Sequence, residues 1–268
     1  MKGKRIDYQI SGQHIEFVKI EKQELDLDAL QKEYPFLYGI LGEALKLVSK
    51  KADRDKFPLW WIISQNDKAR WEQTLKRAVK ILNLKEPKQL KEHCDIIPED
   101  LAGDPQRFRT FVAEMHTLIK LADFHFEKFE KIPRKIGEPT PDYLAYFNQT
   151  PFTIEVCYAR PKKNKEFLAL AGSWYDVGKL MKAFEVMVEE KLPKFKRQLS
   201  AYPEHKKLAA MVYEGLEATA TFLDQDDADR IGQNLLKKAN GTIDSFLITS
   251  MIFDQSSFLV PGHRQSPN

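Results

Sequence analysis

The sequence predicts an α/β protein in which a mixed central sheet flanked by helices follows a mainly helical N-terminal region. Residues 107–121 and 225–239 place apolar side chains at helical spacing, and the second segment is closed by Asn-Gly. Residues 142–147 and 151–159 are short apolar segments joined by a turn, which is typical of a β-hairpin. Helices and strands that alternate along a chain favour a layered α/β domain over a helical bundle.

The first hundred residues are predicted to be mainly helical. Residues 27–50 and 67–83 carry apolar positions at helical spacing, although a proline interrupts the first segment. Residues 84–106 are rich in proline, aspartate and lysine, and this change of composition indicates a boundary. We therefore expect a helical region of unassigned function over residues 1–100 and an α/β domain over residues 107–260.

Further segments complete the predicted α/β domain. Residues 124–132 alternate polar and apolar side chains as a strand does, and residues 137–141 form a turn. A helical region is expected over 174–202, split near a proline, and it is followed by a strand at 207–216. The last expected element is an apolar strand over 243–253.

Composition excludes several classes of protein. Hydrophobic residues make up 43% of the sequence and charged residues 30%, which is too apolar for a disordered chain. Two cysteines are too few for a disulfide framework or a four-thiolate zinc site, and they fit a reducing compartment, so we expect a cytoplasmic protein. No segment approaches the ~20 apolar residues of a membrane span, so a membrane is not an expected partner. P-loop, dinucleotide-binding and nucleophile-elbow motifs are absent from the sequence, which disfavours the enzymes that use them.

Positive charge is concentrated in one segment. The chain has a formal net charge of +3, whereas residues 157–210 alone contain 12 Lys/Arg and 6 Asp/Glu. A clustered basic segment is typical of a surface that contacts a phosphate backbone. The sequence therefore favours nucleic acid as a partner. It leaves the oligomeric state open, with a dimer as one option.

Three carboxylates lie where an apolar environment is expected. Glu114 projects from near the apolar side of the 107–121 helix, and Asp142 opens the first strand of the hairpin. Glu155 lies between two apolar residues of the second strand, where burying a carboxylate is costly unless it is paired or binds a metal. Because the two strands are neighbours, we expect Asp142 and Glu155 to converge. Oxygen ligands of this kind suit Mg²⁺ or Mn²⁺.

The pattern around these carboxylates resembles the PD-(D/E)xK nuclease superfamily. A proline precedes Asp142, and Glu155 follows thirteen residues later in an apolar strand. Glu114 is similar to the glutamate on the family's preceding core helix, and Gln198 with Tyr202 matches the Gln-x-x-x-Tyr spacing of one exonuclease branch. The resemblance implies a restriction-endonuclease-like fold. It also implies metal-dependent hydrolysis of DNA or RNA phosphodiester bonds, with DNA favoured over RNA.

The lysine of the family motif, two residues after the glutamate, is replaced here by Cys157. The resemblance therefore implies a lysine supplied from elsewhere in the chain. We expect this to be Lys194, or else Lys162 or Lys163 in the basic loop after the strand. Arg160 and these loop lysines are also expected to contact the nucleic-acid backbone.

The expected site has three overlapping parts, and two alternatives to a nuclease stay open. Catalysis is assigned to Glu114, Asp142, Glu155, Lys194 and Gln198, binding of Mg (or Mn) to Asp142, Glu155 and Glu114, and nucleic-acid contact to Arg160, Lys162, Lys163 and Tyr202. One alternative is a catalytically inactive nuclease-fold protein that binds nucleic acid or a protein partner. The other is an unrelated α/β interaction protein with its interface on the N-terminal helices. In that protein the three carboxylates are ordinary surface groups. For single residues, the alternative for Glu114 is a helix carboxylate that snorkels or pairs with a basic neighbour, and the alternative for Asp142 is a turn or strand-edge residue.

Overall fold

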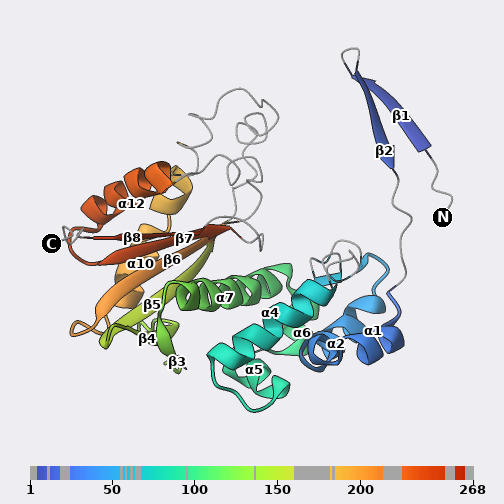
Figure 1. Cartoon of the computed structure of the whole chain (residues 1–268), viewed down its shortest axis with the longest axis horizontal. Helices are drawn as coiled ribbons and strands as arrows, with labels where there is room; N and C mark the ends of the chain where they lie inside the picture. The colour runs from blue at the N-terminus through green and yellow to red at the C-terminus, as the bar shows by residue number, and fades with distance from the viewer. Residues whose placement is uncertain are drawn as a thin grey trace.

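The chain forms a six-stranded mixed sheet with helices on both faces (Figure 1). The computed structural model describes residues 5–10, 13–18, 25–54, 57, 59–60, 63, 68–94, 96–135, 137–159, 182, 185–213, 225–250 and 257–262. Its elements, in chain order, are β1 (Arg5–Ile10), β2 (Gln13–Val18), α1 (Leu27–Glu33), α2 (Pro35–Ser49), α4 (Lys68–Ile81), α5 (Pro87–His93), α6 (Pro98–Gly103), α7 (Pro105–Asp123), β3 (Glu127–Lys131), β4 (Tyr143–Phe147), β5 (Thr150–Ala159), α10 (Leu192–Leu199), β6 (Lys206–Tyr213), α12 (Gln225–Ala239), β7 (Ser245–Ser250) and β8 (Ser257–Pro261). The predicted α/β class with a mixed sheet is confirmed.

The sheet has the strand order β3-β4-β5-β6-β7-β8. Strands β5, β6 and β7 are parallel to one another, and the remaining neighbours are antiparallel. The hairpin of β4 and β5 is closed by Asn148 and Gln149, whose φ angles of 47° and 65° suit the two central positions of a type I′ turn. Its register, continued one residue beyond β4, places Asp142 opposite Glu155.

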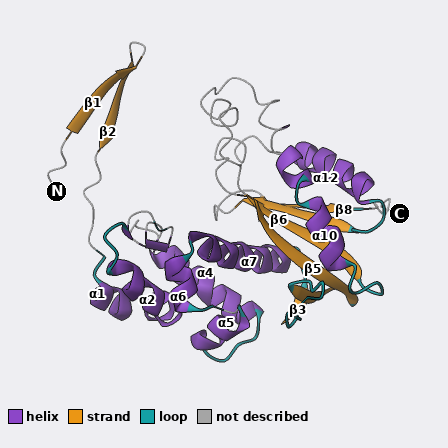
Figure 2. Cartoon of the chain, turned by 180° about the vertical axis from the view of Figure 1, so that it is seen from behind, coloured by secondary structure: helices purple, strands orange, loops and turns teal. Residues whose placement is uncertain are grey.

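Helices cover both faces of this sheet. Helix α7 lies on one face, and α10 and α12 lie on the other (Figure 2). Alternate residues of β6 enter the two cores, with Leu208 on the α7 side and Met211 on the α10 and α12 side. Because both faces of this strand are buried, its sequence is continuously apolar.

The N-terminal helices share their core with the sheet. Helices α4 and α6 contact α7, while α2 packs against α1, α4, α5 and α6. A single cluster of buried side chains joins Leu37 of α2, Phe108 of α7 and Ala145 of β4. Glu72 of α4 is buried in this layer, and its carboxylate accepts a hydrogen bond from the N–H of Leu37 (2.6 Å) in the first turn of α2. The N-terminal helices are thus packed onto the α/β layers.

The predicted boundary at 84–106 contains two short helices. Helices α5 and α6 begin at Pro87 and Pro98, and α7 begins at Pro105. Proline is well tolerated at the first position of a helix because its missing N–H would have no intrahelical partner there. The prolines that indicated a boundary therefore mark helix starts inside a continuous core. Strands β1 and β2 pair separately, as a two-stranded sheet.

The C-terminal strands differ from the prediction. Strand β7 lies within the segment 243–253 where one strand was expected, and residues 251–253 of that segment lie outside the described residues. Strand β8 adds a further antiparallel strand that the sequence analysis did not identify. Strand β8 packs closely on α12, since a Cβ atom on Gly232 would lie 2.7 Å from the side chain of Val260. In the described part of the chain no helix is long and apolar enough to cross a membrane.

Candidate active site

Asp142 and Glu155 meet across the β4–β5 pair, and both are buried. The backbone of β5 holds Asp142, whose N–H donates to the Ile154 carbonyl (2.9 Å) and whose Oδ2 accepts from the Val156 N–H (2.8 Å). Burial raises the pKa of Glu155 to about 8, and the nearby Asp142 carboxylate adds to the increase. A buried carboxyl group with a shifted pKa, such as that of Glu155, is typical of functional sites.

Lys194 of α10 reaches this pair from the sheet face that carries Glu155 and Cys157. Its Nζ lies 2.7 Å from Oε1 of Glu155 and 3.7 Å from the Cys157 Sγ. Helix α10 packs on the sheet through the buried side chains of Phe195 and Leu199, which leaves Lys194 half-exposed above the strand. Burial alone would lower the pKa of Lys194, but Glu155 and Cys157 raise it, and the net shift is upward. The lysine is therefore protonated at neutral pH, beside the position where the family motif has its own lysine.

Glu114 lies on the other side of Asp142, and its carboxylate is bound by two side chains of the protein itself. Its Oε2 contacts the Nζ of Lys131 at 2.7 Å and accepts a hydrogen bond from the Tyr143 hydroxyl at 2.7 Å. Burial raises the pKa of Glu114, and the charge of Lys131 opposes this increase. Glu114 thus pairs with a basic neighbour, as expected under the alternative to a catalytic role for this residue.

Two cations at the site were not among the predicted residues. The Nζ of Lys131 is 3.9 Å from Oδ1 of Asp142, and the guanidinium of Arg134 is 3.4 Å from the same oxygen. The side chain of Arg134 is 56% exposed, so it can contact a solvent-borne anion while it neighbours Asp142. The sequence signal for Lys131 is its place at the end of a strand that neighbours the carboxylate hairpin. Arg134 has no comparable signal.

Gln198 supports the site from α10, one helical turn after Lys194. Its Oε1 accepts a hydrogen bond from the N–H of Thr140 (2.7 Å), in the turn that leads into Asp142. The contact makes Gln198 a positioning residue for that turn. Tyr202 follows α10 and stacks on His205, with ring centroids 5.6 Å apart. The predicted nucleic-acid contacts Arg160, Lys162 and Lys163 lie outside the described residues.

The donor set at Asp142 and Glu155 fits a divalent metal such as Mg²⁺. Oε2 of Glu155 is buried and has no hydrogen-bond partner among the residues that the structure describes. Mg²⁺ is commonly held by one or two carboxylates, with water and substrate phosphate oxygens completing its coordination. Within the described ranges no group of three or more His, Cys, Asp or Glu residues that could hold a metal is found.

No protein-family model, curated protein or solved structure matches this chain. The interpretation of the site therefore depends on the geometry of its own residues.

Proposed function

We propose that this protein is a Mg²⁺- or Mn²⁺-dependent phosphodiesterase that cleaves nucleic acid, with DNA favoured over RNA, on a restriction-endonuclease-like fold. The observation that carries the proposal is the 2.7 Å contact between the ammonium of Lys194 and Oε1 of Glu155. It supplies a lysine to the Asp142–Glu155 pair although Cys157 occupies the usual lysine position. Asp142, one residue before β4, thus lies opposite Glu155 of β5, and Lys194 of α10 contacts that glutamate.

Each residue has a distinct role in the proposed reaction. Asp142 and Glu155 would hold the metal, which when bound acts as a Lewis acid for the phosphate and its attacking water. Lys194 donates hydrogen bonds to the attacking water and stabilises the negative charge that develops, because its pKa is raised and it stays protonated. Arg134, exposed beside Asp142, binds a phosphate oxygen of the substrate.

Cleavage assays with three variants test the proposal. The full chain is incubated with linear duplex DNA, single-stranded DNA and RNA, in Mg²⁺, Mn²⁺ or EDTA. We expect metal-dependent cleavage that Asp142→Asn and Lys194→Met each reduce by about 10²–10⁴-fold, which is typical of losing a charge-stabilising or proton-transfer group. Lys196→Met is the matched control, since Lys196 lies on the same helix and bonds the Lys238 carbonyl (2.8 Å). The proposal fails if all three variants cleave like the wild type, or if no substrate is cleaved in either metal.

A second candidate is a nuclease-fold protein that binds nucleic acid without cutting it. Two observations favour it. Cys157 replaces the motif lysine, and the carboxylate of Glu114 is already bound by the ammonium of Lys131 and the hydroxyl of Tyr143. This candidate predicts saturable oligonucleotide binding in EDTA that Asp142→Asn leaves unchanged, with no cleavage in either metal. Cleavage that depends on Asp142 excludes it.

A further inference from the structure

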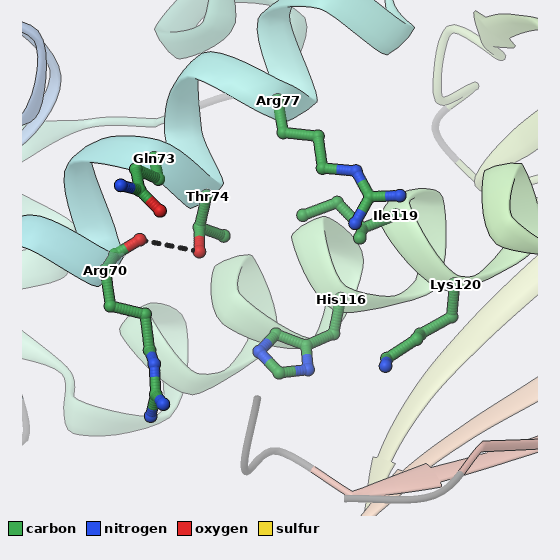
Figure 3. Close-up of a pocket in the computed structure, with 7 residues that line it drawn as sticks. All are labelled: Arg70, Gln73, Thr74, Arg77, His116, Ile119 and Lys120. Carbon is green, nitrogen blue, oxygen red and sulfur yellow. Dashed lines mark hydrogen bonds between the residues drawn. The ribbon is translucent and has the colours of Figure 1, made fainter. Parts of the chain in front are cut away.

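Helices α4 and α7 line a polar pocket of about 260 Å³ away from the candidate active site, here called the basic pocket (Figure 3). Its lining residues come from these two helices only: Arg70, Gln73, Thr74, Arg77, His116, Ile119 and Lys120. None of them belongs to the candidate active site. The pocket is therefore a separate feature that the proposed reaction does not use.

Helical periodicity explains why these side chains meet. Arg70, Gln73, Thr74 and Arg77 recur at positions i, i+3, i+4 and i+7, so they share one face of α4. On α7, His116 and Lys120 are four residues apart and also share a face. The two helices are held together beneath the pocket by apolar contacts, including Trp71 against Phe108 with ring centroids 6.0 Å apart.

The basic pocket has a buried floor and a basic rim. Thr74, His116 and Ile119 are buried, whereas Arg70 and Arg77 are exposed. Figure 3 shows the imidazole of His116 projecting between the side chains of Arg70 and Lys120. A concave surface with buried polar groups below and long cationic side chains above is shaped to enclose a small polar ligand.

Charge gives the class of ligand. Arg70, Arg77 and Lys120 line the pocket, and the lining contains no Asp or Glu. Asp123, outside the lining, neutralises Arg77 through an ion pair. No hydrogen bond or ion pair involves the ammonium of Lys120 in the part of the chain that the structure describes. A lining with three cationic side chains and no carboxylate favours an anionic ligand over a cationic one.

The pocket opens on a different side of α7 from the catalytic carboxylates. His116 and Glu114 are two residues apart, which places their side chains about 200° apart around the helix axis. Glu114 faces Lys131 and Tyr143, on strands β3 and β4. A ligand in the basic pocket therefore does not touch Asp142 or Glu155.

We propose that the basic pocket binds a phosphate group. Guanidinium groups bind phosphate oxygens through paired hydrogen bonds, and the ammonium of Lys120 supplies a further donor from α7. The volume lies just below the ~300–1,000 Å³ of typical small-molecule sites, so it suits a phosphate or pyrophosphate group better than a whole nucleotide. The group belongs to a free phosphate compound or to a nucleic-acid backbone, and both sources present the same oxygens.

The test measures binding in the absence of metal, so that it does not depend on catalysis. The full chain in EDTA is titrated calorimetrically with inorganic phosphate, with pyrophosphate and with an oligothymidylate that has hydroxyl groups at both ends. Arg70→Gln combined with Lys120→Gln removes two rim charges. Lys80→Gln combined with Lys85→Gln removes two exposed charges outside the pocket and is the matched control.

We expect saturable phosphate binding that the pocket variant weakens about tenfold or more and the control leaves within twofold. Urea unfolding without phosphate shows that the pocket variant is folded. If the oligothymidylate competes with phosphate, the source is a nucleic-acid backbone; if phosphate alone binds, the source is a free phosphate compound. Equal affinities in the two double variants, no binding of any probe, or heats reproduced by sodium chloride at equal ionic strength would overturn the proposal.

Discussion

Replacing Glu155 by glutamine should stabilise the metal-free protein. The Glu155 side chain is 3% exposed, its Oε2 has no hydrogen-bond donor among the described residues, and Asp142 adds a like charge. Burial raises the pKa of Glu155 from 4.5 to about 8, which corresponds to a cost on the order of 5 kcal/mol for keeping the group ionised. Glutamine removes the charge at nearly constant shape, and Lys194, being half-exposed, can be solvated by water.

The expected gain is smaller than this cost because a buried amide is itself partly unsatisfied. We expect the free energy of unfolding in EDTA at pH 8 to rise by about 1–3 kcal/mol in Glu155→Gln. With a urea m-value of about 2–3 kcal/mol/M, the unfolding midpoint should rise by about 0.5–1 M. Glu138→Gln removes an exposed carboxylate (65% exposed) and should change stability by less than about 0.5 kcal/mol.

The pH dependence of stability tests whether the pKa of Glu155 is raised on folding. Because the pKa of Glu155 is higher in the folded than in the unfolded protein, its protonated form stabilises the wild type below pH 4.5. This contribution is lost as pH rises from 4.5 to about 8, so the advantage of Glu155→Gln should grow across that window. Urea curves at pH 5 and pH 8 measure it. A variant that is less stable than the wild type at both values, or a difference that does not change with pH, would refute the reasoning.

Two further substitutions should destabilise the protein. Lys131→Met leaves the buried carboxylate of Glu114 without its cation, so we expect the free energy of unfolding in urea to fall by about 3–5 kcal/mol. Adding Glu114→Gln should recover most of this loss, and no recovery would contradict the pairing of the two residues. Glu72→Ala removes the acceptor of the Leu37 N–H at the start of α2, and we expect a loss of about 1–3 kcal/mol by the same assay. A urea midpoint unchanged from wild type would show that the α2 N–H groups find other acceptors.

The sequence was informative wherever a local pattern determines a structure. Alternating side chains and a short turn predicted the β4–β5 hairpin, and strand pairing then places Asp142 beside Glu155 without further information. The contact of Lys194 with Glu155 depends on the packing of α10, so the sequence could offer this lysine only as one of several candidates.

Other features depend on tertiary contacts that no local pattern encodes. Proline is compatible with a linker and with the first turn of a helix, so composition alone could not reveal α5 and α6. The hydrogen bond from Thr140 to Gln198 joins residues far apart in the sequence, as does the Lys131–Glu114 ion pair. Strand β8 was missed because only three apolar residues mark it, and its pairing with β7 determines its conformation.

Helix α7 has helices α4 and α6 on one side and the sheet on the other. Its side chains Val112 and Leu118 are at most 1% exposed, so neither layer can separate without exposing an apolar surface of this helix. Unfolding should therefore be a single cooperative transition, and the backbone amides of α7 should be among the slowest to exchange with deuterium. A fragment that begins at residue 107 would expose the face that α4 and α6 cover, and it should aggregate rather than fold as a smaller copy of the protein.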